Sequence, residues 1–192
     1  MLHVLNQQHP GAVAGLLTTT NEALARVAMH AVRRDLLEAQ AAAAGVPLHV
    51  VPLPWPCSNA DYERVMSAAV AGFVTQGFTH VAFGDLFLED VRRYREERMA
   101  GTGLEPIFPL WETATTLVLA RTMMAGGLEA RLTCVDPRAI DRSCAGRAFD
   151  ATLLADLPPG ADPCGENGEF HTFACAGPMF HHRIAVTVGE IV

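Results

Sequence analysis

Apolar positions along the chain follow two alternating patterns, which predict strands and helices in turn. Three short apolar runs, at 12–17, 48–53 and 80–83, are typical of strands buried in a parallel sheet. Between these runs, apolar residues recur every three or four positions, as on one face of a helix. The first such face comprises Ala25, Met29, Val32, Leu36, Ala39 and Ala43, and the second Tyr62, Val65, Met66, Ala69 and Phe73. The alternation of strands and helices, joined by short connections, favours a parallel sheet with helices on both of its faces.

Capping residues mark the ends of the predicted helices. Gly45 stands where the first helix would take its C-terminal cap, and Gly77 ends the second. Ser58 is followed three residues later by Asp61, which resembles a capping box at the start of the second helix. A third predicted helix, over 88–100, is densely charged.

The pattern changes after residue 103. Prolines cluster there, and the sequence predicts a helix over 112–125 and a strand over 128–135. Two stretches that alternate between apolar and polar residues follow, at 170–175 and 183–188. We therefore predict two domains, a parallel α/β domain over 1–103 and a smaller C-terminal α+β lobe over 104–192.

Composition and charge narrow the function classes. The 192 residues carry 14 basic and 21 acidic side chains, a net charge of −7, and every basic residue is an arginine. An acidic chain lacks the basic face that a nucleic-acid backbone binder needs. A chain without lysine builds no lysine Schiff base, lysine general base or lysine-bearing phosphate loop.

The lengths of the apolar runs and the spacing of the cysteines indicate the cellular compartment of the protein. No apolar run approaches the roughly 20 residues that a membrane span needs, and residues 1–8 lack the basic-then-apolar layout of a secretion signal. The five cysteines are odd in number and form no close pair. We therefore expect a cytoplasmic protein, with no membrane partner, whose cysteines are free thiols.

Polar residues gather at the ends of two predicted strands. In an open parallel sheet, ligands bind at the carboxyl ends of the strands. The candidate ligand-binding residues there are Thr18, Thr19, Asn21, Gly84 and Asp85. Two alternatives stay open from the sequence alone: the threonines cap a loop, and Asp85 is the N-cap of the helix that follows it.

The charged helix offers a second candidate group. Glu89 with Arg93 and Arg92 with Glu96 are pairs four residues apart, which are typical of a solvated helix face. The functional alternative is that Arg92 and Glu96, which share one face, point back toward the strand ends.

A third candidate group lies in the loop after Asp162-Pro163. Gly165 and Gly168 allow positive φ and a close approach of a ligand to the backbone, and Glu166 and Glu169 stand beside them. An acidic loop of this kind holds a magnesium ion, an ammonium group or a polar substrate; a tight surface turn is the alternative. Cys164 with His171, His181 and His182 shows neither a CxxC nor an HxxxH spacing, so we predict no metal ligation by these residues.

Two separated motifs resemble the diphthine–ammonia ligase family. The first comprises Gly84-Asp85-Leu86, Arg92, Glu96, Gly103-Leu104 and Pro109-Leu110-Trp111. The second comprises Cys164-Gly165-Glu166-Asn167-Gly168-Glu169-Phe170 and Gly177-Pro178-Met179-Phe180. Their order and spacing fit the family from about residue 2 to the C-terminus.

The resemblance implies a fold and a reaction. It implies an adenine nucleotide alpha-hydrolase-like fold of the N-type ATP pyrophosphatase group, in which a Rossmann-like lobe holds ATP and Mg²⁺ and a C-terminal lobe shapes the acceptor site. ATP adenylates a carboxylate, pyrophosphate leaves, and ammonia displaces AMP to form an amide. By this resemblance the ATP-binding residues are Thr18, Thr19, Asn21, Gly84 and Asp85, the catalytic residues Glu166 and Glu169, and the substrate-binding residues Arg92, Glu96, Gly165, Gly168 and His171.

The sequence departs from the family pattern in its phosphate loop. Family members carry a Ser-Gly-Gly-Lys-Asp-Ser loop after the first strand, and the 192 residues contain none; residues 2–7 resemble the helix that should follow it. We favour a start codon upstream of Met1 as the explanation. The alternative is a loop that has been lost, in which case the protein is a non-catalytic nucleotide-binding or sensing module; a purely structural or interaction role is a third hypothesis.

The acceptor stays open as well. A lysine-free chain rich in alanine and arginine is typical of a high-GC bacterial genome, where the diphthine acceptor would be absent. The nitrogen donor and the oligomeric state, a homo-oligomer included, are also left open by the sequence.

Overall fold

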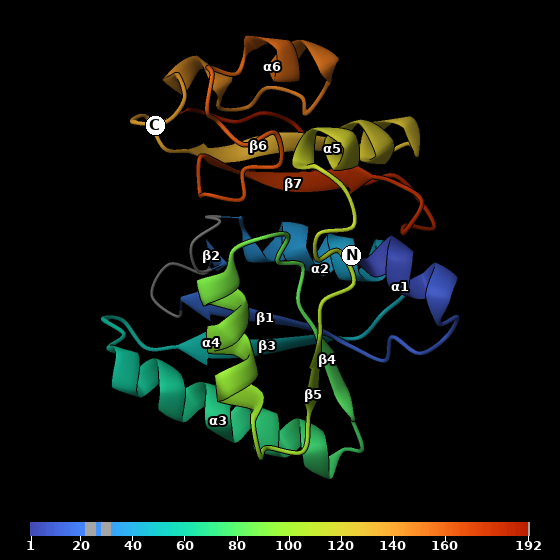
Figure 1. Ribbon diagram of the computed structural model, residues 1–192, viewed down its shortest axis with the longest axis vertical. Helices are drawn as coiled ribbons and strands as arrows, with labels where there is room; N and C mark the ends of the chain where they lie inside the picture. Colours follow the sequence, from blue (N-terminus) through green and yellow to red (C-terminus); the bar gives the residue numbers. More distant parts are fainter. Residues whose placement is uncertain (22–25, 28–31, 192) are drawn as a thin grey trace. The chain divides into compact units, whose positions relative to one another are not determined.

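The structure of the chain, a computed structural model, describes residues 1–21, 26–27 and 32–191 (Figure 1). The chain divides into two compact units: unit 1 is Met1–Ala25 with Val46–Thr113, and unit 2 is Arg26–Gly45 with Ala114–Val192. These units do not coincide with the predicted ranges 1–103 and 104–192. The functional division into a nucleotide-binding domain and an acceptor-site domain stays a prediction.

Unit 1 is a mixed α/β unit built on two pairs of parallel strands (Figure 1). β1 (Leu16–Asn21) pairs with β3 (Leu48–Leu53), and β4 (His80–Ala82) pairs with β5 (Glu105–Ile107). The two pairs belong to separate sheets. The parallel pairing predicted from the apolar runs is therefore confirmed for β1 with β3, whereas β4 lies in another sheet, beside a strand that the runs did not predict. The helices of this unit are α1 (Leu2–Gln8), α3 (Asn59–Thr75) and α4 (Glu89–Met99).

Unit 2 is built on an antiparallel pair of strands. β6 (Glu129–Val135) pairs with β7 (Phe170–Ala176), with two irregularities of register. The other elements of this unit are β2 (Arg26–Val27), α2 (Arg34–Ala44), α5 (Thr116–Ala125), the 3-10 helix η1 (Arg142–Cys144) and α6 (Ala151–Asp156). Its larger core cluster consists of Ala120, Ala130, Leu132, Ile140, Cys144, Phe149, Leu153 and Phe170.

A second core cluster in unit 2 joins α2 to β7. Its buried members are Val32, Ala43, Phe173, Cys175 and Ile184. The Gln40 side chain donates a hydrogen bond to the Ala174 carbonyl at 2.8 Å, and the His181 amide donates one to the Ala43 carbonyl at 2.7 Å. The amphipathic face predicted for this helix is therefore the face that meets β7.

The predicted helix caps are confirmed. Ser58 is the N-cap of α3, where its hydroxyl accepts a hydrogen bond from the Asp61 amide at 3.1 Å and donates one to the Asp61 carboxylate at 2.6 Å. Gly45 ends α2 in the left-handed region, with φ of 66°. The sequence predicts these caps correctly because a helix cap depends only on residues that are close together in the chain.

The predicted first strand and first helix are displaced along the chain. The strand expected at 12–17 forms as β1, at Leu16–Asn21. The threonines at 18–20 therefore lie inside the strand and not in a loop after it, which suits β-branched residues. The helix whose face was expected from Ala25 begins at Arg34, and Arg26–Val27 form a strand; Ala25 and Met29 lie outside the described residues. The described members of that face, Val32, Leu36, Ala39 and Ala43, all belong to the core cluster that includes Phe173 and Cys175 of β7.

The C-terminal half also departs from the pattern. α5 begins at Thr116, capped by the Thr115 hydroxyl, and not near residue 112. The stretch 183–188 forms no strand; its contact with β7 includes the hydrogen bond from the Ile184 amide to the Cys175 carbonyl. Among the described residues, no helix is long and apolar enough to cross a membrane.

Candidate functional site

The polar residues of β1 lie at the carboxyl end of that strand. Thr18, Thr19 and Asn21 stand beside Val50, Val51 and Leu53 of β3 in register. Because successive strand residues point to opposite faces, Thr19 and Asn21 share one face and Thr18 shares the other with the buried Thr20. The three predicted ligands are thus near one strand end but do not share a single face of it.

Asp85 follows the carboxyl end of β4 and pairs with a residue of α4. Its Oδ2 lies 3.5 Å from Nε of Arg95, and neither of these two buried atoms has a hydrogen-bond partner in the described part of the chain. Leu88 is the N-cap residue of α4, so the N-cap alternative for Asp85 is wrong. Gly84 has ordinary negative φ, since it is not among the glycines of positive φ, and its conformation therefore does not require glycine.

Arg92 lies between two aromatic rings. Its guanidinium carbon is 4.8 Å from the centre of the Phe108 ring and 4.7 Å from that of Trp111. Its Nε donates a hydrogen bond to Oε1 of Glu96 at 2.8 Å. The pair four residues apart that is typical of a solvated helix face is therefore present, and Arg92, with 36% of its side chain exposed, also contacts both rings.

The same aromatic cluster extends to Arg95. Phe83 and Phe108, which follow β4 and β5, stack with ring centres 5.7 Å apart, and Arg95 covers Phe83 at 4.8 Å. The backbone amide of Glu112 donates to the Leu86 carbonyl at 2.9 Å, which ties the segment after β5 to the segment after β4. Two arginines and three rings thus meet at the carboxyl ends of this strand pair.

Sequence reasoning identified Arg92 and Trp111 as motif members without placing them in contact. The roles of Phe83, Phe108 and Arg95 were missed, because aromatic residues next to strands also fit an ordinary core. The signal that could have found them is the position of both phenylalanines directly after strands that pair in parallel.

The loop 162–170 in unit 2 is organised by two buried carboxylates. Glu169 Oε1 accepts hydrogen bonds from the Asp162 amide at 2.8 Å and from the Asn167 side chain at 3.1 Å, and Oε2 accepts one from the Asn167 amide at 3.1 Å. Asp162 Oδ1 accepts from the amides of Cys164 at 2.8 Å and Glu166 at 3.2 Å. Side-chain oxygens thus satisfy backbone donors that would otherwise be buried without partners.

Electrostatics agree with an ionised Glu169. Burial alone raises the pKa of this carboxyl, but the hydrogen bonds from Asp162 and Asn167 stabilise the carboxylate more, and the pKa of Glu169 lies below its ordinary value. A carboxylate with both oxygens bonded inside its own loop is suited to positioning that loop. The catalytic role predicted for Glu169 stays a prediction.

The two glycines of this loop differ in what they require. Gly165 has φ of 72°, and a Cβ on it would lie 2.7 Å from the Phe170 carbonyl oxygen. Gly168 has φ of 87°, with open space where a Cβ would be. Close approach of the chain to itself, and not only to a ligand, explains Gly165.

Cys164, in the loop, and His171, directly after it, are both uncharged at neutral pH. Burial, together with the nearby carboxylates of Asp162 and Glu166, raises the pKa of the Cys164 thiol to about 12. The thiol donates a hydrogen bond to the Thr116 carbonyl at 3.3 Å. Burial lowers the pKa of His171 from its ordinary value. A thiolate nucleophile at Cys164 is therefore disfavoured, and Glu166, half-buried in the middle of the loop, is its remaining acidic group.

These residues form no metal cluster with other described residues, and a cavity of unit 1 lies away from them. No three His, Cys, Asp or Glu side chains cluster as metal ligands within the described ranges. A cavity of about 500 Å³ in unit 1 lies at the opposite, amino ends of β1 and β4, where its lining includes His9, Gly15, Phe78 and His80. None of the predicted site residues lines it.

Comparison with known families identifies part of the chain. Residues 115–192 match the family model described as the diphthamide synthase C-terminal domain. The match runs from α5 through β7, and so includes the whole loop 162–170 but not α2, which packs on β7. The C-terminal part of the chain is therefore related to diphthamide synthase, in agreement with the resemblance carried by that loop. The comparison with curated proteins found no match.

Proposed function

We propose that this protein is an ATP-binding relative of the AMP-forming amide ligases, which adenylate a carboxylate and transfer ammonia to it. The match of residues 115–192 to the diphthamide synthase C-terminal domain is the observation that carries the proposal. That match supports a function related to the diphthamide pathway. The ATP-dependent chemistry, the cytoplasmic location and the adenine nucleotide alpha-hydrolase-like fold are parts of the proposal.

In this proposal the nucleotide binds at the carboxyl ends of the parallel strands of unit 1. The Thr18 and Thr19 hydroxyls, the Asn21 amide and the backbone at Gly84 contact ATP, and Asp85 lines the site. Ligands of open parallel sheets bind at this end of the strands, and the parallel register of β1 with β3 places the β1 residues there. Asp85 would also keep Arg95 in place through their contact at 3.5 Å.

Mg²⁺ in this proposal enters with the nucleotide. The ion prefers phosphate oxygens, water and one or two carboxylates to a cage of protein side chains, which suits a chain whose described residues form no three-ligand cluster. When bound, Mg²⁺ neutralises charge on the departing pyrophosphate. Because the sequence has no lysine, the positive side chains available to an anionic group are arginines, and Arg92 at the ends of β4 and β5 is our candidate.

The loop 162–170 would shape the acceptor site. Glu169 holds the loop through the three hydrogen bonds that it accepts, and Glu166 contacts the incoming amine or acceptor. Gly165, Gly168 and His171 form the surrounding surface, and Arg92 with Glu96 bind an anionic part of the substrate. The acceptor in this proposal is a carboxylate, and diphthine is one member of that class.

A second candidate function is a nucleotide sensor without catalysis. The observation that favours it is the pairing of the charged residues near the strand ends. Arg92 is bonded to Glu96 and Arg95 lies against Asp85, so neither cation is free to neutralise a leaving pyrophosphate. A sensor would bind ATP or AMP and release neither AMP nor pyrophosphate from it.

One experiment separates these functions. The full chain is titrated calorimetrically with ATP and with AMP in the presence of Mg²⁺, and is then incubated with ATP, ammonium and a carboxylate acceptor. Formation of AMP and pyrophosphate supports the ligase, and saturable binding without either product supports the sensor. Absence of binding by both nucleotides contradicts both proposals.

A further inference from the structure

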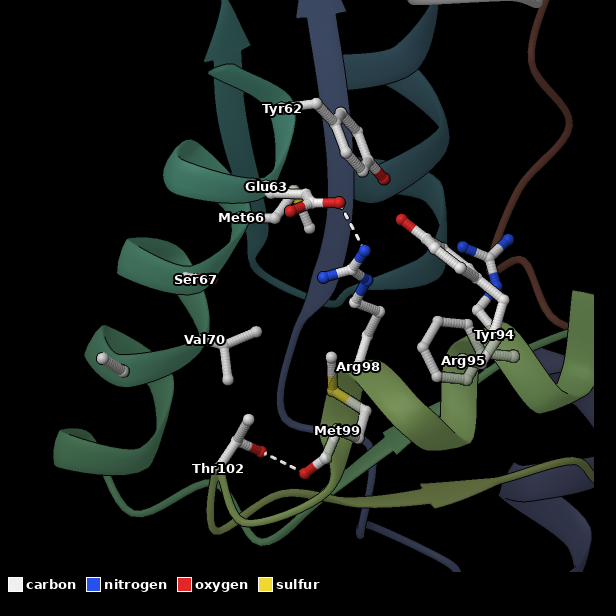
Figure 2. Close-up of a pocket in the computed structure, with 12 residues that line it drawn as sticks. Tyr62, Glu63, Met66, Ser67, Val70, Tyr94, Arg95, Arg98, Met99 and Thr102 are labelled. Carbon is white, nitrogen blue, oxygen red and sulfur yellow. Dashed lines mark hydrogen bonds and ion pairs between the residues drawn. The ribbon is translucent and has the colours of Figure 1, made fainter. Parts of the chain in front are cut away.

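A small cavity lies between α3 and α4 (Figure 2). Its volume is about 210 Å³. Met66 and Val70 of α3 and Met99 of α4 line it, and Phe83 contributes at the end of β4. The walls are therefore mostly apolar, and two of them are methionines, which adapt their shape to a guest and favour contact with aromatic rings.

The volume limits the size of the guest. An apolar cavity of about 150 Å³ holds one benzene molecule. A cavity of about 210 Å³ therefore has room for a single ring that carries one small substituent, and not for a nucleotide.

The charges around the cavity favour an anionic substituent. Arg95 and Arg98 line it together with one carboxylate, that of Glu63, while Arg95 also contacts Asp85 outside the lining. Arg98 and Glu63 form an ion pair that joins α4 to α3 (Figure 2). Both partners keep more than two-fifths of their side-chain surface exposed, at 47% and 42%, so the pair adds little stability, and a second carboxylate can compete for Arg98.

Hydroxyl groups complete the polar side of the cavity. Tyr62 and Tyr94 both contribute to the lining, from opposite helices, and Figure 2 shows their hydroxyls turned toward each other. Ser67 contributes a third hydroxyl from α3. These groups donate hydrogen bonds to carboxylate oxygens as readily as to water.

We propose that this cavity binds a small molecule made of one aromatic ring and one carboxylate group. The ring lies among Met66, Val70 and Met99, and the carboxylate takes the place of Glu63 beside Arg98. None of the residues proposed to contact ATP lines the cavity, and Arg95, which lines it, lies 3.5 Å from one of them, Asp85.

The test is a titration of the full chain with benzoate, followed by calorimetry and by chemical shifts of the methionine methyl groups. We expect saturable binding, with shifts at Met66 and Met99. Arg98→Gln should weaken benzoate binding by about tenfold, as expected when one charged hydrogen bond is lost. Glu63→Gln should tighten it, because the competing carboxylate is removed.

Arg93→Gln is the matched control. It removes the same charge from α4 at an exposed residue that does not line the cavity, so benzoate affinity should stay at the wild-type value. Ser67→Phe, which fills the cavity from α3, should abolish binding of benzoate. Its fold is checked by circular dichroism, and Arg98→Gln keeps the test decisive should that variant fail to fold.

Three outcomes would overturn the proposal. They are no benzoate binding up to its solubility limit, equal loss of affinity in Arg98→Gln and Arg93→Gln, and preferential binding of benzylamine over benzoate. None of these measurements involves ATP, so failure here leaves the proposed function untouched.

Discussion

Glu169 accepts a hydrogen bond from the backbone amide of Asp162 at 2.8 Å, so a buried carboxylate fastens the beginning of the loop 162–170 to its end. The same carboxylate accepts two further hydrogen bonds, both from Asn167. Glu166 is only half-buried, and its backbone amide donates a hydrogen bond to the Asp162 carboxylate at 3.2 Å. The two glutamates that look equivalent in the sequence therefore have different structural tasks.

We expect Glu169→Gln to destabilise the protein by about 1–3 kcal/mol, the cost of leaving a buried hydrogen-bonding group unsatisfied. The new side-chain NH₂ group would face the Asn167 amide, and two donors cannot bond each other. Urea unfolding measures the free energy of unfolding. Glu166→Gln, at a half-buried residue, is the matched comparison; it should lower that free energy less than Glu169→Gln does, while it lowers acceptor binding in the proposed function. Equal stability of the two variants and the wild type would contradict the role of Glu169 in positioning the loop.

The contribution of Glu169 should depend on pH. Its pKa in the folded state lies below the ordinary value of 4.5, which it recovers on unfolding. The unfolded chain therefore binds more protons in this range, so the contribution is fully present above pH 4.5 and is lost as pH falls through the folded pKa. We expect the difference in unfolding free energy between wild type and Glu169→Gln to be constant near neutral pH and to shrink as the pH falls below 4.5 and through the folded pKa. A difference that grows on acidification would contradict the assignment.

Gly165 and Gly168 provide a test of backbone constraint. Gly168→Ala should cost about 1–2 kcal/mol, because alanine resists positive φ. Gly165→Ala should cost clearly more, because the added Cβ also meets the Phe170 carbonyl oxygen at 2.7 Å. Thermal unfolding of the two variants side by side gives the ranking. The opposite order would mean that the loop does not pack on Phe170 as described.

Arg92 and Arg93 are neighbours on α4 with different surroundings. Arg92 stacks on Phe108 and Trp111, whereas Arg93 is exposed. We expect Arg92→Ala to lower stability by about 0.5–1 kcal/mol through loss of the stacking. In the proposed function it also weakens ligand binding far more than Arg93→Ala does. Calorimetric titration with ATP measures the second effect, and equal small losses would return Arg92 to a purely structural role.

The Cys164 thiol should resist alkylation in the folded protein. With a pKa of about 12, its thiolate fraction at pH 8 is about one in ten thousand. Iodoacetamide should therefore leave Cys164 unmodified until urea unfolds the chain, as peptide mass mapping would show. Rapid modification of Cys164 under native conditions would mean that the thiol is ionised and lies in a different environment.

Local signals in the sequence predicted the fold well where the interactions are local. The Ser58 cap, the Gly45 cap and the strand at 48–53 agree with the structure. β5 was missed because three residues with a proline at the centre show no alternation. The start of α2 was misplaced because apolar residues at helical spacing continue N-terminal to Arg34, where the helix begins.

The candidate site shows the same limit. Sequence identified Arg92, Asp85 and the loop 162–170, because rare motifs carry them. It did not reveal that Asp85 faces Arg95 or that Arg92 lies between two rings, because those contacts join segments far apart in the chain. It also gave Glu166 and Glu169 one role, since burial separates them and burial is a property of the folded loop.

The packing of α2 on β7 has a consequence for the order in which the protein folds. The hydrogen bond from Gln40 to the Ala174 carbonyl joins residues 134 positions apart. During synthesis, α2 leaves the ribosome long before β7 exists, and the whole intervening chain must be made before the cluster around Ala43 and Phe173 can close. Contacts of such long range form late and slowly, so this core, although α2 is made early, stays open until β7 has been made.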